Sequence, residues 1–193
     1  MASIVPISEA DSAAAVATIV AAFAADPVER WLWPERKAYD AAFPEFVRAF
    51  GGDAFRRGTA WGVDRSEAVA IWLEPGAEAD EGPLIEVLTE TVAAARHDDL
   101  FATLEQMAAL HPSEPHWYLP WLAVSPADQG RGLGGLLLEH GLTIVDAAGL
   151  PAFLETPNPR TVPLYERHGF EVIGVARSGA CPPMTSMLRR APT

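Results

Sequence analysis

Residues 129–135 read Gln-Gly-Arg-Gly-Leu-Gly-Gly and place four glycines within six positions. They follow the aromatic and aliphatic stretch 116–124, which predicts a strand buried on both faces, and they open the stretch 133–148, which predicts a helix. A glycine-rich turn between a strand and a helix presents backbone N–H groups and the positive end of the helix dipole, and both attract phosphate. The sequence therefore predicts a phosphate-binding turn made of Gln129, Gly130, Arg131, Gly132, Leu133, Gly134 and Gly135.

The same glycines also satisfy the G-x-G-x-x-G pattern of dinucleotide-binding folds, with Glu155 about twenty residues further on. In that fold the first glycine follows its strand almost directly, whereas residues 125–129 intervene here. The stretch 157–193 is also rich in proline and short for another strand-helix-strand crossover of about thirty residues. Both observations argue against a nicotinamide cofactor and for a different phosphate ligand.

Helical and strand-like stretches alternate along the whole chain of 193 residues. We expect helices at 10–25, 35–50, 84–96, 98–110 and 163–168, and strands at 59–63, 68–73, 151–156, 170–175 and 184–188. The linker 64–67 predicts a hairpin between the first two of these strands, and the acidic segment 76–82 predicts a surface loop. This order predicts an α/β (α+β layered) fold in a single domain over residues 1–193.

Pro120 lies inside the stretch that is expected to form a central strand. Because proline has no N–H to donate to a strand ladder, it predicts a bulge or a local parting of the neighbouring strands. A parting at this point would leave the main-chain donors of the following residues free.

The composition excludes several classes of function. A formal net charge of -12 repels the phosphate backbone of nucleic acids, so we expect no nucleic-acid partner. The longest apolar stretch, residues 13–25, is shorter than the roughly twenty residues of a membrane span, and residues 1–11 contain no Lys or Arg of a secretion signal. We therefore expect no membrane partner and a cytoplasmic protein.

Cysteine and histidine usage argues against disulfide and metal chemistry. Cys181 is the only cysteine of the chain, which excludes an internal disulfide. The five histidines are scattered without helical pairing or cysteine partners, so we expect no metal site.

The glycine turn matches the Q/R-x-x-G-x-G/A acyl-CoA motif of the GNAT superfamily of N-acetyltransferases, and it lies between a strand and a helix as that motif requires. Residues 153–158, Phe-Leu-Glu-Thr-Pro-Asn, and 164–170, Leu-Tyr-Glu-Arg-His-Gly-Phe, resemble the second cofactor region of that family. The resemblance implies the GNAT fold, in which a central mixed, mostly antiparallel sheet is flanked by helices and its strands part at the acetyl-CoA site. It also implies an enzyme that uses acetyl-CoA as co-substrate.

Within the superfamily the chain most resembles puromycin N-acetyltransferase and its relatives. The matching segments are residues 22–27, 70–72, 114–134 and 151–170, which cover the cofactor half of the chain densely. Residues 30–50 and 76–111 do not match, and such segments shape the acceptor pocket in this family. The resemblance therefore describes the cofactor half and leaves the acceptor open.

The resemblance also implies roles for individual residues of the cofactor half. Leu122, Ala123 and Val124 would pair with the pantetheine arm like an added strand, and one of their N–H groups would polarise the thioester carbonyl. Tyr165 matches the tyrosine that protonates the departing thiolate, and its other interpretation is an aromatic ring packed under the short helix. Asn158 resembles a residue near the pantetheine or that tyrosine, and its other interpretation is a surface turn.

A base must also remove a proton from the incoming ammonium. Glu155, at the end of an expected strand beside the cofactor, is one candidate, and His111 and His116 are the alternatives. A purely structural carboxylate that accepts backbone hydrogen bonds is the other interpretation of Glu155. The sequence leaves this choice open.

The acceptor is expected to be the primary amine of a small molecule with an apolar or aromatic body. Trp31 and Trp33 are predicted as walls of its pocket, and Trp72 and His116 are further candidate acceptor contacts. We expect a monomer or a homodimer. The alternative function is a catalytically silent acyl-CoA-binding sensor or regulatory module, and the presence of both Tyr165 and Glu155 favours the enzyme.

Overall fold

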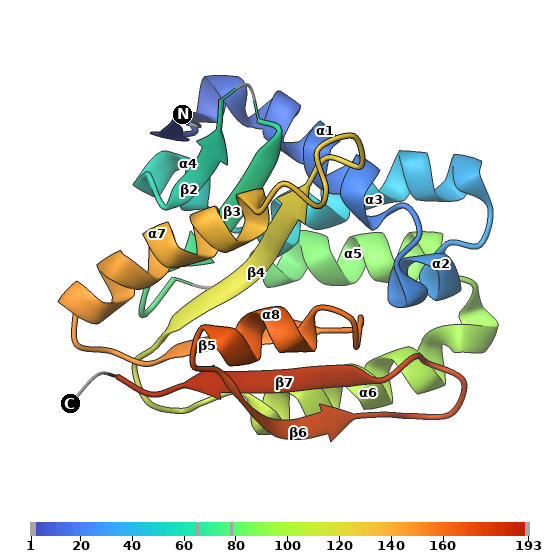
Figure 1. Cartoon of the computed structure of the whole chain (residues 1–193). Helices are drawn as coiled ribbons and strands as arrows, with labels where there is room; N and C mark the ends of the chain where they lie inside the picture. Colours follow the sequence, from blue (N-terminus) through green and yellow to red (C-terminus); the bar gives the residue numbers. More distant parts are fainter. Residues whose placement is uncertain (1–2, 65, 78, 192–193) are drawn as a thin grey trace.

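The computed structural model describes residues 3–64, 66–77 and 79–191, and its centre is one seven-stranded sheet in the order β1-β2-β3-β4-β5-β7-β6 (Figure 1). The strands are β1 (Ile4–Pro6), β2 (Ala60–Val63), β3 (Ala68–Leu73), β4 (Trp117–Val124), β5 (Ala152–Thr156), β6 (Glu171–Ala176) and β7 (Met184–Arg189). β4 and β5 run parallel, and the other pairings among the described strands are antiparallel. The sheet is therefore mixed and mostly antiparallel, as predicted.

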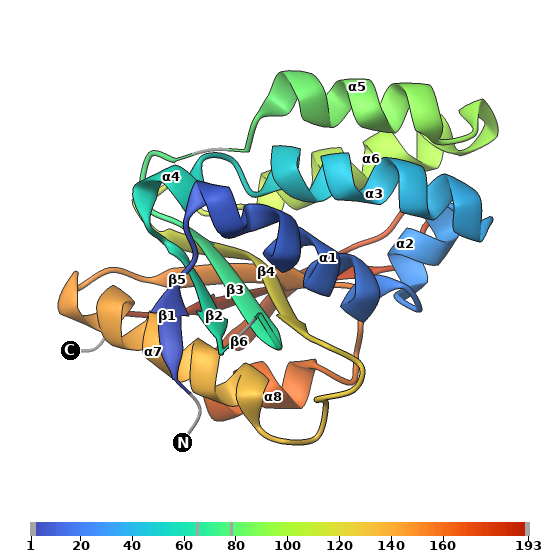
Figure 2. The same ribbon diagram turned by 90° about the horizontal axis from the view of Figure 1, so that it is seen from above.

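Helices cover both faces of this sheet. The α-helices are α1 (Ser12–Phe23), α2 (Pro27–Leu32), α3 (Arg36–Phe50), α4 (Ala54–Arg57), α5 (Glu81–Thr91), α6 (His97–Leu110), α7 (Leu133–Ala147) and α8 (Val162–Arg167), with short 3-10 turns at Glu9–Asp11 and Ala94–Arg96. Figure 2 shows α1, α3, α5 and α6 on one side of the sheet and α7 and α8 on the other. The architecture is a three-layer α/β sandwich of the kind the sequence predicts.

Each face of the sheet has its own apolar core. On the face of α1 and α3, an aromatic cluster centres on Phe43 and Trp121, whose ring centroids lie 5.6 Å apart at right angles. On the opposite face, Trp72 and Leu137 are completely buried together with α7. Because successive strand residues point to opposite faces, β4 and β5 contribute side chains to both cores.

Gly141 explains how closely α7 approaches the sheet. A Cβ at this position would collide with the indole ring of Trp72, so only glycine lets the helix pack against that ring. The contact fixes α7, and with it the glycine turn at its start, over the middle of the sheet.

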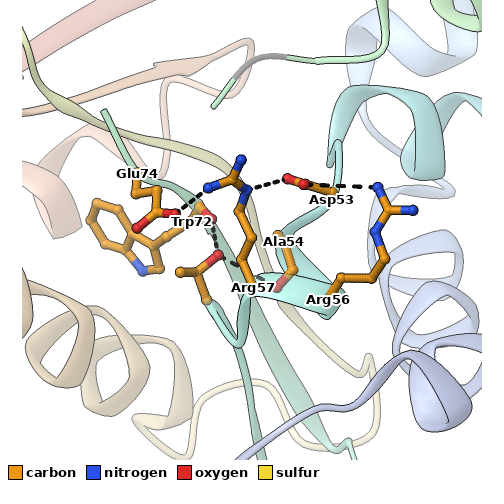
Figure 3. Close-up of polar contacts among 7 residues, drawn as sticks. Asp53, Ala54, Arg56, Arg57, Trp72 and Glu74 are labelled. Carbon is orange, nitrogen blue, oxygen red and sulfur yellow. Dashed lines mark hydrogen bonds and ion pairs between the residues drawn. The ribbon is translucent and has the colours of Figure 1, made fainter. Parts of the chain in front are cut away.

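A polar cluster joins α4 to the end of β3 (Figure 3). The Arg57 guanidinium binds Asp53 at 2.7 Å and Glu74 at 2.6 Å, and Thr59 donates a hydrogen bond to the Trp72 carbonyl at 2.6 Å. The Arg57 side chain is 44% exposed, so its ion pairs add little stability and serve mainly to orient the chain.

The sequence predicted most of these elements but not all of them. β1, α2 and α4 were not predicted, because each spans six residues or fewer and shows too little periodicity to detect. Arg65 of the predicted hairpin linker and Glu78 of the predicted acidic loop lie outside the described residues. No helix in the described part of the chain has both the length and the apolar character needed to cross a membrane.

Candidate active site

The parallel strands β4 and β5 separate in the middle of the sheet. Their pairing begins at Trp117 with Ala152 and ends at Leu119 with Leu154. On its other side β4 stays paired with β3 as far as Val124, apart from a register shift opposite Leu119 and Pro120. Pro120 thus marks both the irregularity and the point where the strands part, as its missing N–H predicted.

The parting leaves one edge of β4 without a strand partner from Leu122 to Val124. A cavity of about 760 Å³ opens there, and these three residues line it together with Gln129 and Gly134 of the glycine turn. The volume lies within the roughly 300–1,000 Å³ range of small-molecule and cofactor sites. A free strand edge beside an anion-binding turn fits an extended ligand with amide groups at one end and phosphates at the other.

The glycine turn has the backbone conformation that phosphate binding requires. Gly130 and Gly132 have φ angles of 80° and 81°, in the left-handed region that favours glycine, and Gly132 is the N-cap of α7. α7 spans 15 residues, so the positive end of a long helix dipole points at the turn. Leu133 is buried under the turn, and Gly135 lies in the first turn of the helix.

The side chains of the turn hold it in place. The Gln129 side-chain amide donates to the Val124 carbonyl at 3.3 Å. The Arg131 guanidinium pairs with Asp128 and, at 3.4 Å, with Glu67. These partners occupy Arg131 at the rim, so the backbone N–H groups of the turn, and not this side chain, are its candidate donors to an anion.

Glu155 lies at the other lip of the parted strands. Its Oε2 atom accepts a hydrogen bond from the Tyr118 hydroxyl at 3.0 Å, and the Ser186 hydroxyl is 3.4 Å from Oε1. Burial raises the pKa of Glu155 to about 7, although both hydroxyl contacts lower it. A cavity-lining carboxyl with a pKa near neutrality has the properties of a general base at physiological pH.

Tyr165 reaches the same cavity from the other face of the sheet. It comes from α8, lies 8% exposed in the core of the α7 face, and packs against Phe170. Burial raises its pKa above the usual value for a phenol, so the hydroxyl stays protonated and can donate. Glu155, in contrast, is two residues after Phe153 in β5, so its side chain points to the same face of the sheet as Phe153. That is the face covered by α1 and α3.

Asn158 lines the cavity in the loop between β5 and α8. Its Oδ1 atom accepts the backbone N–H of Arg160 at 3.0 Å, and its carbonyl accepts the Thr161 hydroxyl at 2.8 Å. The asparagine therefore shapes the turn that leads to Tyr165. This structural role is compatible with a contact between Asn158 and a ligand.

The four predicted acceptor contacts lie outside the cavity. Trp33 is completely buried and donates its indole N–H to Thr91 at 2.9 Å. Trp72 packs under α7 on the opposite face of the sheet, and Trp31 packs on the core edge beneath the Arg96 guanidinium, 5.9 Å from its ring centroid. The apolar character of these tryptophans serves packing, which their sequence pattern alone does not distinguish from ligand binding.

His116 and His111, the alternative bases, lie at the amino end of β4. Their Nε2 atoms are 2.9 Å apart, and both rings pack near Phe153. Burial and the neighbouring His116 lower the pKa of His111 to about 4. Neither ring lines the cavity, which opens at the carboxyl end of the strand.

Several residues that line the cavity were not singled out from the sequence. Tyr118 comes from β4 and Met107 from α6, Asp26 is the N-cap of α2, and Glu29 lies in the first turn of α2. Their signal was present only as aromatic residues in a buried strand and as an acidic cap before Pro27. In the described part of the chain, no three His, Cys, Asp or Glu side chains are grouped so that they could hold a metal ion.

Comparisons with known proteins agree with this geometry. The sequence profile of the Acetyltransferase (GNAT) family matches residues 28–170. An uncharacterised N-acetyltransferase of Schizosaccharomyces pombe is 26% identical over 198 aligned positions, which cover 93% of this chain and 79% of the relative.

Solved structures show the same fold. A crystal structure titled histone acetyltransferase HPA2 and related acetyltransferase, from Corynebacterium glutamicum, superposes with a TM-score of 0.70 and 25% identity over 100% of this chain and 97% of that one. Arylalkylamine N-acetyltransferase 2 from Aedes aegypti superposes with a TM-score of 0.69 and 11% identity over 99% of each chain, a likeness of fold.

The chain belongs to the GNAT acetyltransferase family and is an N-acetyltransferase. The family generally uses acetyl-CoA as co-substrate, and the free edge of β4 and the glycine turn are the parts of this chain that fit it. The predicted fold, including the parted strands, is confirmed.

Proposed function

We propose that this enzyme transfers the acetyl group of acetyl-CoA to the primary amine of a small acceptor with an apolar or aromatic body. The observation that carries the proposal is the position of Glu155 and Tyr165. They belong to opposite faces of the sheet, yet both line the one cavity that passes between β4 and β5. An amine on the Glu155 side and a thioester on the Tyr165 side would meet at the parted strands.

Each residue has a defined task in the transfer. Glu155 accepts a proton from the acceptor ammonium, either directly or through a water molecule, and leaves a nucleophilic amine. A backbone N–H on the free edge of Leu122, Ala123 or Val124 donates to the thioester oxygen as negative charge develops on it. The amine attacks the thioester carbon, and Tyr165 donates its proton to the sulfur as the carbon–sulfur bond breaks. The nitrogen loses its second proton to water as the amide forms, and water reprotonates the Tyr165 phenolate.

The pKa values of the two groups suit these tasks. With a pKa of about 7, Glu155 is largely ionised at slightly alkaline pH and basic enough to take up a proton. Burial raises the pKa of Tyr165, so its hydroxyl carries the proton that it must donate, although the same shift makes it a weaker acid toward the thiolate.

The acceptor class is supported by the lining of the cavity on the Glu155 side. Phe46, Phe50 and Trp121 form an aromatic wall there, and Leu104 and Met107 of α6 face it. Burial of an apolar body against this wall stabilises the complex by about 25 cal/mol per Å². The resemblance to puromycin N-acetyltransferase supports an aromatic acceptor. The histone and arylalkylamine enzymes with this fold suggest the two acceptor classes to compare, peptides and arylalkylamines.

A panel assay tests the proposal. Purified protein is incubated with acetyl-CoA and separate sets of arylalkylamines, alkylamines, aminonucleosides, polyamines and histone-like peptides, and free CoA and acetylated product are both measured. We expect acetylated small amines with apolar bodies to give the highest kcat/KM. Acetylation of peptides in preference to every small amine would refute the acceptor class, and no acetylated product from any amine would refute the proposed transfer to a small amine.

A further inference from the structure

One carboxyl group in the cavity has no partner. Glu29 of α2 is 5% exposed and lines the cavity, and its Oε2 atom is fully buried without a hydrogen-bond partner among the described residues. Burying a carboxylate without a partner costs several kcal/mol, so such a group is retained where a ligand supplies the missing partner.

Among the described residues, no neighbour of Glu29 supplies that partner. Tyr39 lies near enough for the charge of Glu29 to raise its pKa, but its hydroxyl donates to the Val20 carbonyl at 2.7 Å. Asp26 is a second carboxyl, and it already accepts the Val28 N–H at 3.0 Å as the N-cap of α2. Burial raises the pKa of Glu29, and the neighbouring charge of Asp26 raises it further, so the free protein favours the protonated carboxyl and a bound cation would stabilise the carboxylate.

The charges along the cavity differ between its two ends. The ionisable groups of acidic and basic side chains that line it are the carboxyls of Asp26, Glu29 and Glu155 and the guanidinium of Arg160. Arg160 lies in the loop before α8, beside Asn158 and the cofactor half. Asp26 and Glu29 belong to α2 and its N-cap, so the lining that this element contributes is acidic and, among the described lining residues, includes no basic side chain.

Apolar side chains make up much of the lining of the cavity that holds both Glu29 and Glu155. Among them are Phe46 of α3, Leu88 of α5, Leu104 of α6 and Trp121 of β4. A ligand that reaches from one carboxyl group to the other would pass along this wall and needs an apolar middle section.

On the basis of the proposed function, we propose that Glu29 binds a second cationic group of the acceptor. The acceptor would then be a dibasic molecule, with one primary amine beside Glu155 and an ammonium or guanidinium group held by Glu29 at the other end of an apolar spacer. The cation would give the Glu29 oxygens the charge-assisted hydrogen bonds that the protein lacks there. It would also fix the orientation of the acceptor, because a spacer of the wrong length could not satisfy both carboxyl groups.

Matched acceptors test the proposal. A series of α,ω-diaminoalkanes of increasing length is compared with alkylamines that replace one amine by a methyl group, and 4-(aminomethyl)phenethylamine is compared with phenethylamine. We expect kcat/KM for the best dibasic acceptor to exceed that of its monobasic partner by roughly ten- to a hundredfold, the range of one charge-assisted hydrogen bond. Equal values for each pair would overturn the proposal.

Glu29→Gln removes the charge and keeps the shape of the side chain. We expect the variant to lose most of the preference for dibasic acceptors, and the measured quantity is the ratio of kcat/KM between each dibasic acceptor and its monobasic partner. Glu90→Gln is the matched control, because this carboxyl is exposed on α5 and lies outside the cavity. A ratio that stays at the wild-type value in Glu29→Gln, or that falls equally in Glu90→Gln, would overturn the role of Glu29.

A binding measurement separates this proposal from the proposed function. The same acceptors are titrated by calorimetry into protein saturated with CoA, where no transfer occurs. We expect the dibasic members to bind more tightly than the monobasic ones and Glu29→Gln to abolish the difference. Acetylation without this difference would refute the Glu29 site alone, whereas the difference without acetylation would refute the proposed transfer alone.

Discussion

The two faces of the sheet at the parted strands differ in how clearly the sequence predicts them. On the α7 face, a helix of 15 residues starts at a glycine turn whose φ angles require glycine, and Tyr165 follows in the short helix α8. On the other face, the wall comes from five helices, among them the short α2, and its aromatic residues pack on one another as well as on the cavity. The first side uses local backbone geometry, and the second uses packing between distant segments.

Glu155 lies on the face of α1 and α3 and is the proposed general base, so changing it should have the largest effect. We expect Glu155→Gln to lower kcat by about a hundredfold to ten-thousandfold, because a neutral amide cannot take up the proton of the ammonium. Binding of acetyl-CoA, measured by thermal shift, should persist. Glu171→Gln, an exposed carboxyl on β6, is the control with the same change of charge.

The wild-type pH profile checks the same role. Since burial raises the pKa of Glu155 to about 7 in the free protein, kcat/KM should be highest above that pH and should fall about tenfold per pH unit below it. The inflection should be absent from the residual activity of Glu155→Gln. A profile that stays flat from slightly alkaline to mildly acidic pH would mean that another group is the base.

On the cofactor side, Tyr165→Phe should lower kcat by about a hundredfold, the lower end of the effect of a general acid. The hydroxyl acts on the leaving sulfur, so the Kd for acetyl-CoA should change little. The ring keeps its packing against Phe170, and the melting temperature should show that the fold is intact. Wild-type turnover at saturating substrate would show that Tyr165 serves packing only.

The glycine turn should control cofactor affinity without contributing to proton transfer. At about a hundred times its Kd, acetyl-CoA should stabilise the wild type by about 2.7 kcal/mol, a rise in Tm of roughly 5–10 °C. Gly132→Asp should abolish this rise, because it places a carboxylate where the pyrophosphate binds. Gly132→Asn is the control for backbone strain, since asparagine tolerates the left-handed φ of 81° without adding charge.

The expected shifts separate the possible explanations of this variant. If acetyl-CoA raises the Tm of Gly132→Asp as much as that of the wild type, the phosphates bind elsewhere. If the rise is lost equally in Gly132→Asn, backbone strain explains the loss. NADH should cause no shift in the wild type.

The smallest expected effect is on the acceptor KM. It should distinguish Met107, which lines the cavity, from Trp31, which the sequence predicted as a pocket wall. Met107→Ala removes apolar contact inside the cavity and should raise the acceptor KM severalfold, at about 0.8 kcal/mol per buried methylene. Trp31→Ala should leave that KM within about twofold and lower the melting temperature instead, because Trp31 packs on the core edge. Steady-state kinetics and thermal melts check both variants, and the reverse pattern would restore Trp31 as a pocket wall.

Prediction succeeded where local conformation and chemistry coincide. A proline in a buried strand cannot complete a ladder, and a run of glycines between a strand and a helix has few uses other than a close backbone approach. Trp33 and Trp72 show the opposite case. The sequence around a tryptophan does not show whether its ring packs in a core or lines a pocket. Only the sheet face and the helix that cover each ring distinguish the two.

The sequence by itself determined the class of fold, the parting of the strands at Pro120 and the position of the glycine turn, because each depends on residues that are neighbours along the chain. The tertiary structure alone decided that Glu155 faces the helices of the acceptor side while Tyr165 faces α7, and that Glu29 lies in the same cavity as both. Glu29 and Glu155 are far apart in sequence, and the packing of α2 on α3 and on the apolar core of that face brings them to one cavity. That packing follows from the sum of many weak apolar contacts, which no single motif records.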